Sequence, residues 1–287
     1  MVKQRDRKPP WLKVTGFAGT NYNEVNLLLK KYGLNTVCHA ANCPNRGECF
    51  NRGTATFLIL GPVCSRSCRF CDVQSGNPVA VNPEEPTQVA KAARELGLKH
   101  VVVTSVTRDD LPAGGADQFV QTIEKIREYL PSSTIEVLTP DFKSDPSVVD
   151  RIIKAKPDVF NHNVETVVRL YPTVRPQADY HGSLELLRYV AENSDIITKS
   201  GLMVGLSEKS DELRQTFDDL ARAQVQVLTI GQYLAPSANH LPVVRYVTPD
   251  EFDLFKEQAE QAGIRQAFSG PLVRSSYLAD MVLPPHS

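Results

Sequence analysis

From residue 56 onward, short runs of β-branched and apolar residues alternate with longer segments in which apolar residues recur at helical spacing. The short runs occupy residues 56–60, 101–105, 135–138, 159–161, 198–204 (interrupted by Gly201) and 227–232. Each run has the length of a buried strand, and strands that alternate with helices are typical of a parallel sheet. The pattern therefore predicts six βα units in the α/β class.

The segments between these runs show one apolar face each. Positions 89, 92, 93 and 96 follow the i, i+3, i+4, i+7 spacing of an amphipathic helix, and positions 213, 217, 220 and 221 nearly repeat it. A last helix is predicted to begin at Thr248, because Pro249 and Glu251 complete a capping box behind it. It should stop at Gly263, which can adopt a left-handed conformation.

Six units are too few for a closed eight-stranded barrel. We therefore predict a partial (β/α)6 TIM-like barrel with a wide lateral mouth, spanning residues 56–264. The alternative is an open doubly wound sheet, but the glycine fingerprint of dinucleotide-binding folds is absent after the first strand. Residues 1–55 and 265–287 lie outside the alternation and are predicted to be extensions packed on the barrel.

Charge and hydropathy exclude two classes of partner. The 32 basic and 33 acidic side chains nearly cancel, so no broad positive field for nucleic acid is expected. The longest apolar runs are far shorter than the roughly 20 residues of a membrane span. The first residues contain no apolar signal segment, so we expect a soluble protein of the cytoplasm or an equivalent reducing compartment. Six cysteines there indicate metal or redox chemistry rather than disulfides.

Three of these cysteines, Cys64, Cys68 and Cys71, form a CxxxCxxC motif directly after the first predicted strand. Active sites of parallel barrels gather at the carboxyl ends of the strands, so these thiolates should face the catalytic end. A four-iron cluster needs four ligands, and three thiolates leave one iron open. A structural zinc site is the alternative, but the paired CxxC spacing or nearby histidine that completes such sites is missing.

The other three cysteines, Cys38, Cys43 and Cys49, form a CxxxxCxxxxxC pattern in the N-terminal extension. If this group also holds a four-iron cluster, its fourth ligand must be a side-chain oxygen or nitrogen, because no further thiol remains. His39 is the local candidate. A histidine beside a ligand is more often a packing residue, so both interpretations stay open.

With both motifs in place, the chain resembles the radical SAM superfamily and, within it, the lipoyl synthase family. The similarity continues through residues 104–111 (TSVTRDDL), 161–166 (NHNVET), 199–206 (KSGLMVGL), 231–234 (GQYL) and 274–277 (RSSY). It covers nearly the whole chain. The double cysteine pattern together with a terminal RSSY is highly specific.

This resemblance implies two [4Fe–4S] clusters and S-adenosylmethionine (SAM) as cosubstrate. Cys64, Cys68 and Cys71 would hold the cluster whose open iron binds SAM, and the resulting 5′-deoxyadenosyl radical would abstract hydrogen from unactivated carbon. The auxiliary cluster on Cys38, Cys43 and Cys49 would take a serine of the RSSY motif as its fourth ligand. We assign Ser276, with Ser275 as the fallback.

Contacts to SAM are expected from loops after the barrel strands. The predicted residues are Thr104, Ser105, Arg108, Asn163, Glu165, Lys199 and Gln232. Glu165 and Lys199 could instead form ion pairs within the barrel. Leu202, Met203 and Tyr233 are candidates for lining an acyl slot, although ordinary core packing is the favoured role for each of them taken alone.

The implied reaction inserts two sulfur atoms at C6 and C8 of an octanoyl group on a lysine of a lipoyl-carrier domain, with the auxiliary cluster as sulfur donor. A ferredoxin or flavodoxin is the implied electron donor. Another sulfur-inserting radical SAM enzyme, such as one acting on dethiobiotin, is disfavoured by the upstream cysteines. An electron carrier or iron–sulfur scaffold without catalytic activity is the other alternative. It is disfavoured because a carrier would normally saturate its clusters with four thiolates.

Two positions depart from the family pattern. Members commonly read RLYPRVRPGA and GLGE, whereas this chain has Thr173 in place of an arginine and Ser207 in place of a glycine. Arg175 is retained, so the basal chemistry should persist. These departures point to altered substrate or partner recognition, as in a diverged second copy with a narrower acceptor.

Overall fold

A computed structural model describes residues 8–14, 19–277 and 279–281 of the chain. Its strands form one sheet in the order in which they occur in the sequence, and all pairings are parallel except that of β1 with β2. The strands are β1 (Asn35–Thr36), β2 (Thr56–Ile59), β3 (His100–Ser105), β4 (Thr134–Leu138), β5 (Val159–Asn161), β6 (Ile197–Val204), β7 (Val227–Gln232) and β8 (Gln266–Gly270). This is the α/β partial barrel that the alternation predicted.

The six predicted strands correspond to β2 through β7, with ends shifted by at most one residue. The structure adds one strand at each edge of the sheet. Residues 266–270, which the alternation left outside the barrel, pair in parallel with β7 and extend the sheet as β8. This placement was wrong in the sequence analysis because Gln266–Gly270 is only half-buried and lacks the apolar run of the other strands.

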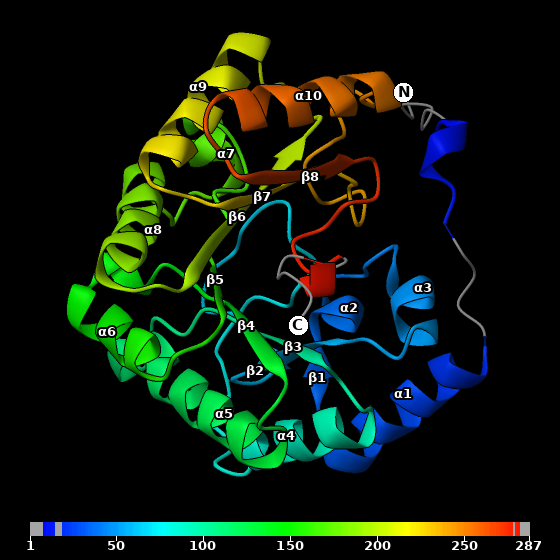
Figure 1. Ribbon diagram of the computed structural model, residues 1–287. Coiled ribbons are helices and arrows are strands. Elements are labelled where there is room, and N and C mark those ends of the chain that lie inside the picture. The colour runs from blue at the N-terminus through cyan, green and yellow to red at the C-terminus, as the bar shows by residue number, and fades with distance from the viewer. Residues whose placement is uncertain (1–7, 15–18, 278, 282–287) are drawn as a thin grey trace.

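Helices cover the outer face of the sheet, as Figure 1 shows. They are α4 (Glu85–Glu95), α5 (Ala116–Tyr129), α6 (Pro146–Lys154), α8 (Tyr180–Asn193), α9 (Ser210–Arg222) and α10 (Pro249–Gln261), with the single turn α7 (Tyr171–Val174) after β5. Short 3-10 turns lie at Pro10–Leu12, Pro112–Gly115, Phe142–Ser144, Val168–Leu170 and Ala279–Met281. Within the described residues, no helix is long and apolar enough to cross a membrane.

Strand and helix faces meet as the periodicity predicted. Val101 and Val103 of β3 are fully buried, as are Ala92 and Ala93 of α4, and all four belong to one apolar core. The alternate β3 positions point to the opposite, inner face of the sheet. Helix α10 begins behind the Thr248 capping box and is followed by Gly263 at φ +113°, as predicted.

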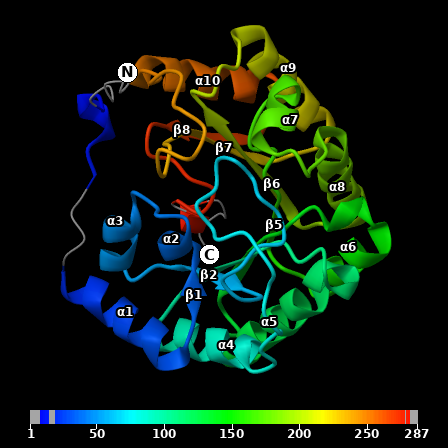
Figure 2. The ribbon, with the colours of Figure 1, turned by 180° about the vertical axis from the view of Figure 1, so that it is seen from behind.

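The open side of the barrel, between β1 and β8, is filled by the two ends of the chain. Helices α1 (Thr20–Tyr32), α2 (Val37–Ala40) and α3 (Arg46–Asn51) lie there, and the segment after β8 runs between them and the sheet (Figures 1 and 2). The Trp11 indole donates to the Val247 carbonyl at 3.1 Å. The N-terminal segment is thereby attached to the chain just before α10.

Candidate functional site

The CxxxCxxC motif lies on the loop at the carboxyl end of β2. Backbone amides of Arg66 and Thr107 donate to Cys64 Sγ at 3.4 and 3.3 Å, respectively. Amide donors of this kind stabilise a thiolate. Burial raises the pKa of the Cys68 thiol, and it raises the pKa of the Cys71 thiol to about 12. Such thiols give up their protons when a metal supplies positive charge, which suits them as cluster ligands.

Arg66 fixes this loop from within the motif. Its buried guanidinium bonds Asp109, which follows β3, at 2.7 and 2.9 Å. It also bonds Asp141, which follows β4, at 2.5 and 2.9 Å. Paired contacts to planar carboxylates impose orientation as well as attraction. The loop is therefore held to the carboxyl ends of two neighbouring strands.

Glu165 and Arg175 bring opposite charges to the same region. Burial raises the pKa of Glu165, although the positive charge of Arg175 opposes that shift. Arg175 donates to the Asn163 carbonyl at 2.8 Å, and its Nε is buried without a partner. Both charges act on the Cys68 thiol. The sequence analysis noted Arg175 only as retained, and its position in the RPQA stretch did not reveal that it faces the cysteine loop.

Three of the residues predicted to contact the cosubstrate have polar atoms near this loop that can still form hydrogen bonds. The Ser105 hydroxyl and the Asn163 Oδ1 are buried without hydrogen-bond partners. Glu165 accepts from Asn163 Nδ2 at 3.0 Å and stands at φ +65°. Buried polar atoms are rarely left unpaired, so these atoms fit a polar ligand.

The other four predicted residues are engaged within the protein. Lys199 bonds both carboxylate oxygens of Glu136 at 2.9 Å, which is the ion-pair role left open by the sequence. Arg108 pairs with Asp110, and Thr104 donates to the Leu138 carbonyl. Gln232 donates to three carbonyls and accepts from one backbone amide. These contacts make them supports of the barrel rather than open donors.

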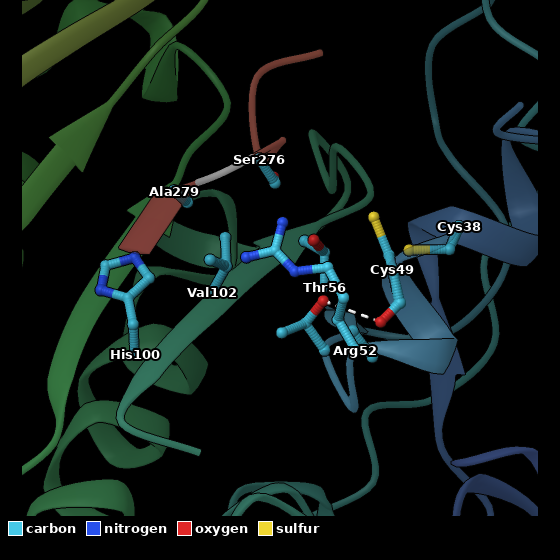
Figure 3. Close-up of a pocket in the computed structure, with 10 residues that line it drawn as sticks. Cys38, Cys49, Arg52, Thr56, His100, Val102, Ser276 and Ala279 are labelled. Carbon is cyan, nitrogen blue, oxygen red and sulfur yellow. Dashed lines mark hydrogen bonds between the residues drawn. The ribbon is translucent and has the colours of Figure 1, made fainter. Parts of the chain in front are cut away.

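Two cysteines of the second group line one cavity with Ser276. Cys38, Cys49 and Ser276 line it together with Arg52, and Figure 3 shows their side chains around the same space. Burial raises the pKa of Cys38 to about 11 and that of Cys49 to about 12, and negative charge on Cys43 raises both further. The Cys38 and Cys49 thiols, the neighbouring Cys43 and the Ser276 hydroxyl form a donor set that fits a metal cluster.

The two serines of the RSSY motif face different sites. Ser275 Oγ accepts from Asn163 Nδ2 at 2.6 Å, on the side of the first cysteine loop. Ser276 lines the second cavity. His39 forms a hydrogen bond with Thr36 and packs edge-on against the Phe50 ring, and it is absent from the cavity lining. Of these three candidates, Ser276 alone lines the cavity of Cys38 and Cys49.

Two residues that the sequence analysis did not select also belong to these sites. Arg52 lies three residues after Cys49, and its positive charge lowers the pKa of that thiol against the effect of burial. His240 forms a hydrogen bond with the Cys71 carbonyl at 3.0 Å, from the long loop after β7. Spacing from a cysteine could have revealed Arg52, whereas no local signal marks His240. Among the described residues, no three His, Cys, Asp or Glu side chains are arranged to hold a single metal ion.

The candidate acyl-slot residues have mixed positions. Leu202 and Tyr233 are buried in the core between the sheet and the helices, and the Tyr233 hydroxyl donates to the Leu241 carbonyl at 2.8 Å. Met203 is partly buried on the other face of β6. Core packing therefore accounts for Leu202 and Tyr233. Met203 also packs against this core but is only partly buried, so it is the one of the three that still has surface to offer an acyl chain.

Strand β2 separates the two cysteine sites. Cys49 precedes its first residue, Thr56, and Cys64 follows its last residue, Ile59. One site thus lies toward the amino end of the strands, where Thr56 and His100 line its cavity, and the other lies beyond the carboxyl end.

Comparisons with known proteins agree with this arrangement. A model of the Radical SAM superfamily matches residues 58–220. The lipoyl synthase of Caldanaerobacter subterraneus subsp. tengcongensis is 53% identical over 96% of this chain and 97% of its own. The lipoyl synthase of Caldicellulosiruptor bescii is 52% identical over 96% and 94%, respectively. The crystal structure of methylornithine synthase (PylB) aligns with a TM-score of 0.52 at 16% identity, over 95% of this chain and 85% of that one, which shows a shared fold. On sequence, fold and paired cysteine sites, the chain belongs to the lipoyl synthase family of the radical SAM superfamily.

Proposed function

We propose that this lipoyl synthase inserts two sulfur atoms at C6 and C8 of an octanoyl group carried on a lysine of a lipoyl-carrier protein. Two [4Fe–4S] clusters and SAM are the cofactors of the family. The observation that carries the proposal is the presence of two incomplete thiol sites on either side of β2, one of them facing Ser276. A carrier of electrons has no need for two clusters that each lack a thiolate.

Cys64, Cys68 and Cys71 are proposed to hold the cluster that binds SAM. That cluster and SAM together supply a radical able to remove hydrogen from an unactivated carbon, which no side chain can do at neutral pH. The protein contributes position. Arg66 holds the loop in place, and the unpartnered atoms of Ser105 and Asn163, with the Glu165 carboxylate, orient the cosubstrate.

Cys38, Cys43, Cys49 and Ser276 are proposed to hold the auxiliary cluster that donates sulfur. An alkoxide is a hard ligand and matches iron–sulfur chemistry less well than a thiolate does. Ser276 should therefore let its iron go more readily than a fourth cysteine would. The Arg52 cation beside Cys49 offsets the negative charge that the deprotonated ligands bring into the cavity.

The protein substrate is proposed to be an octanoylated lipoyl domain, and a ferredoxin or flavodoxin is the proposed electron donor. We place the chain in the cytoplasm, because its six cysteines are all free and a reducing compartment keeps them so. Thr173 is exposed on α7, and Gln177 accepts from the Ser67 amide at 2.7 Å beside the first cysteine loop. We propose that this surface contacts the carrier domain and limits which carrier domains the protein accepts.

The test is to incubate the anaerobically reconstituted protein with SAM, a strong reductant and an octanoyl-lysyl peptide, and to follow the peptide by mass spectrometry. A gain of two sulfur atoms alongside 5′-deoxyadenosine would establish the activity. If deoxyadenosine forms but the peptide is unchanged, the assay is repeated with an intact octanoylated domain. If that domain also gains no sulfur, the proposed substrate is wrong. If neither product forms with both clusters loaded, the electron-carrier interpretation replaces this one.

A further inference from the structure

Ser275 is the neighbour of the proposed cluster ligand but contacts the opposite site. Its hydroxyl accepts from Asn163 Nδ2 at 2.6 Å, and Asn163 follows β5 at the carboxyl end of the barrel. Ser276 lines the cavity of Cys38 and Cys49. The two adjacent residues thus connect the cosubstrate side of the barrel with the auxiliary site.

Asn163 is held firmly enough to serve as an anchor. Arg175 Nη1 binds its carbonyl at 2.8 Å, and its side chain is packed against Gly201, where an added Cβ would lie 2.5 Å from Asn163 Oδ1. Its Nδ2 is shared between Glu165 Oε1 and Ser275 Oγ, while Oδ1 is buried without a partner. A hydrogen-bond donor on the bound cosubstrate would give Asn163 Oδ1 its missing partner. This bond would fix the side-chain orientation in which Nδ2 donates to Ser275.

The segment that carries Ser276 has further attachments, which lie on the N-terminal extension. Asn45 Nδ2 donates to the Leu272 carbonyl at 2.6 Å, and the Tyr277 hydroxyl donates to Glu48 at 3.0 Å. The backbone at Val273 approaches β7 closely, because an added Cβ on Gly231 would lie 2.1 Å from the Val273 oxygen. Ser275 adds a side-chain hydrogen bond from this segment to the loop after β5.

We propose that Ser275 is a positioning residue that holds Ser276 at the auxiliary site through Asn163, and that cosubstrate binding at Asn163 tightens this hold. The inference rests on the proposed function, since it takes Ser276 as a cluster ligand and Asn163 as a cosubstrate contact. It gives the two serines separate tasks, one as ligand and one as anchor. Occupancy of the first site thereby stabilises the ligand set of the second.

The primary test is hydrogen exchange of the cluster-loaded protein, read at the backbone amides of residues 272–277. In the wild-type chain, SAM should slow exchange in this segment. In Ser275→Ala, exchange without SAM should be about fivefold faster, the effect of losing one ordinary hydrogen bond, and SAM should no longer slow it. Ser275→Thr keeps a hydroxyl and should behave like the wild-type chain.

Two comparisons exclude a general loss of structure. Ser132→Ala removes an exposed hydroxyl in the turn before β4 and should leave the exchange of residues 272–277 unchanged. Exchange within β6 should be the same in all variants. If Ser275→Ala fails to load its clusters, the wild-type and Ser275→Thr chains still show whether SAM slows exchange in residues 272–277. If SAM slows exchange in neither chain, the proposed coupling is wrong.

Iron release to a chelator separates this inference from the function on which it rests. Ser276→Ala should release auxiliary iron fastest, and Ser275→Ala should fall between it and the wild-type chain. If Ser276→Ala retains iron as firmly as the wild-type chain, the ligand assignment itself fails. If Ser276→Ala is labile while Ser275→Ala matches the wild-type chain in both iron release and exchange, only the positioning role of Ser275 is overturned.

Discussion

Lys199 and Glu136 form an ion pair in the interior of the barrel, with the Lys199 ammonium 2.9 Å from both carboxylate oxygens and neither side chain exposed to solvent. Asn161 donates to the same carboxylate at 2.9 Å, and His100 lies 3.6 Å from it. Burial alone would raise the pKa of Glu136, but the charge of Lys199 and the contacts with His100 and Asn161 together outweigh burial and keep the pKa below its ordinary value. A buried pair of this kind depends on both partners.

Replacing Lys199 with Met is therefore expected to destabilise the fold by about 3 to 5 kcal/mol, because the Glu136 carboxylate would remain buried without its cation. The measurement is the midpoint of thermal unfolding under anaerobic conditions. Glu136→Gln combined with Lys199→Met removes both charges and should recover much of the loss. Lys125→Met breaks an exposed pair with Glu128 and should shift stability by less than about 1 kcal/mol. Equal effects at Lys199 and Lys125 would contradict the argument.

Gly231→Ala is expected to disturb the auxiliary site from a distance. The new Cβ would lie 2.1 Å from the Val273 oxygen and 3.1 Å from Arg274 Nη1, so the segment ahead of Ser276 must move. Iron analysis should show loss of the auxiliary share of bound iron. Gly270→Ala is the matched control, because its nearest neighbour is Val273 Cγ2 at 3.3 Å, a side-chain methyl that can give way. Full iron content in Gly231→Ala would show that the segment adapts without releasing Ser276.

Ser207→Gly is expected to stabilise the protein by about 1 kcal/mol. Ser207 stands at φ +90°, where a side chain is strained and glycine is not, and it is exposed. Its carbonyl accepts from Arg169 at 2.8 Å, a contact that glycine retains. Ser210→Gly, made at the start of α9, should lower stability instead, because glycine disfavours a helix. Thermal unfolding of both variants checks the opposite signs.

His162 predicts a loss of stability in mild acid. Burial, with the positive charge of Arg175 as the next cause, lowers the pKa of His162 to about 4. Between its ordinary pKa near 6.5 and about 4, the unfolded chain takes up a proton that the folded chain does not. As the pH is lowered through this range, His162 should therefore reduce the free energy of unfolding by up to about 1.4 kcal/mol per pH unit.

His162→Gln removes this term, so the difference in stability between wild type and variant should shrink or reverse as the pH is lowered from 7 to 5. Both proteins carry the same clusters, so taking the difference in stability between them cancels any effect of pH on the clusters. His181→Gln replaces an exposed histidine on α8 and serves as the matched control variant. A constant difference between wild type and His162→Gln across this range would refute the assignment.

The sequence by itself determined the class of fold and the chemistry. Apolar runs and apolar periodicity located β2 through β7 and the helices α4 and α9, because burial against a sheet imposes a regular repeat on the chain. A capping box located the start of α10. The cysteine spacings identified both thiol groups, because the members of each group lie close together in the chain. It could not locate β8, whose half-buried residues carry no apolar run.

Only the tertiary structure decided which polar residues are free to act. Lys199 and Gln232 look like candidates for ligand contact along the chain, but Glu136 and four backbone groups engage them in the folded barrel. Likewise, Ser275 and Ser276 differ in their surroundings because one contacts Asn163 and the other lines the cavity of Cys38, each more than 100 residues away. Periodicity and motifs are local properties of a chain, whereas the partner of a buried polar group is set by segments that only folding brings together.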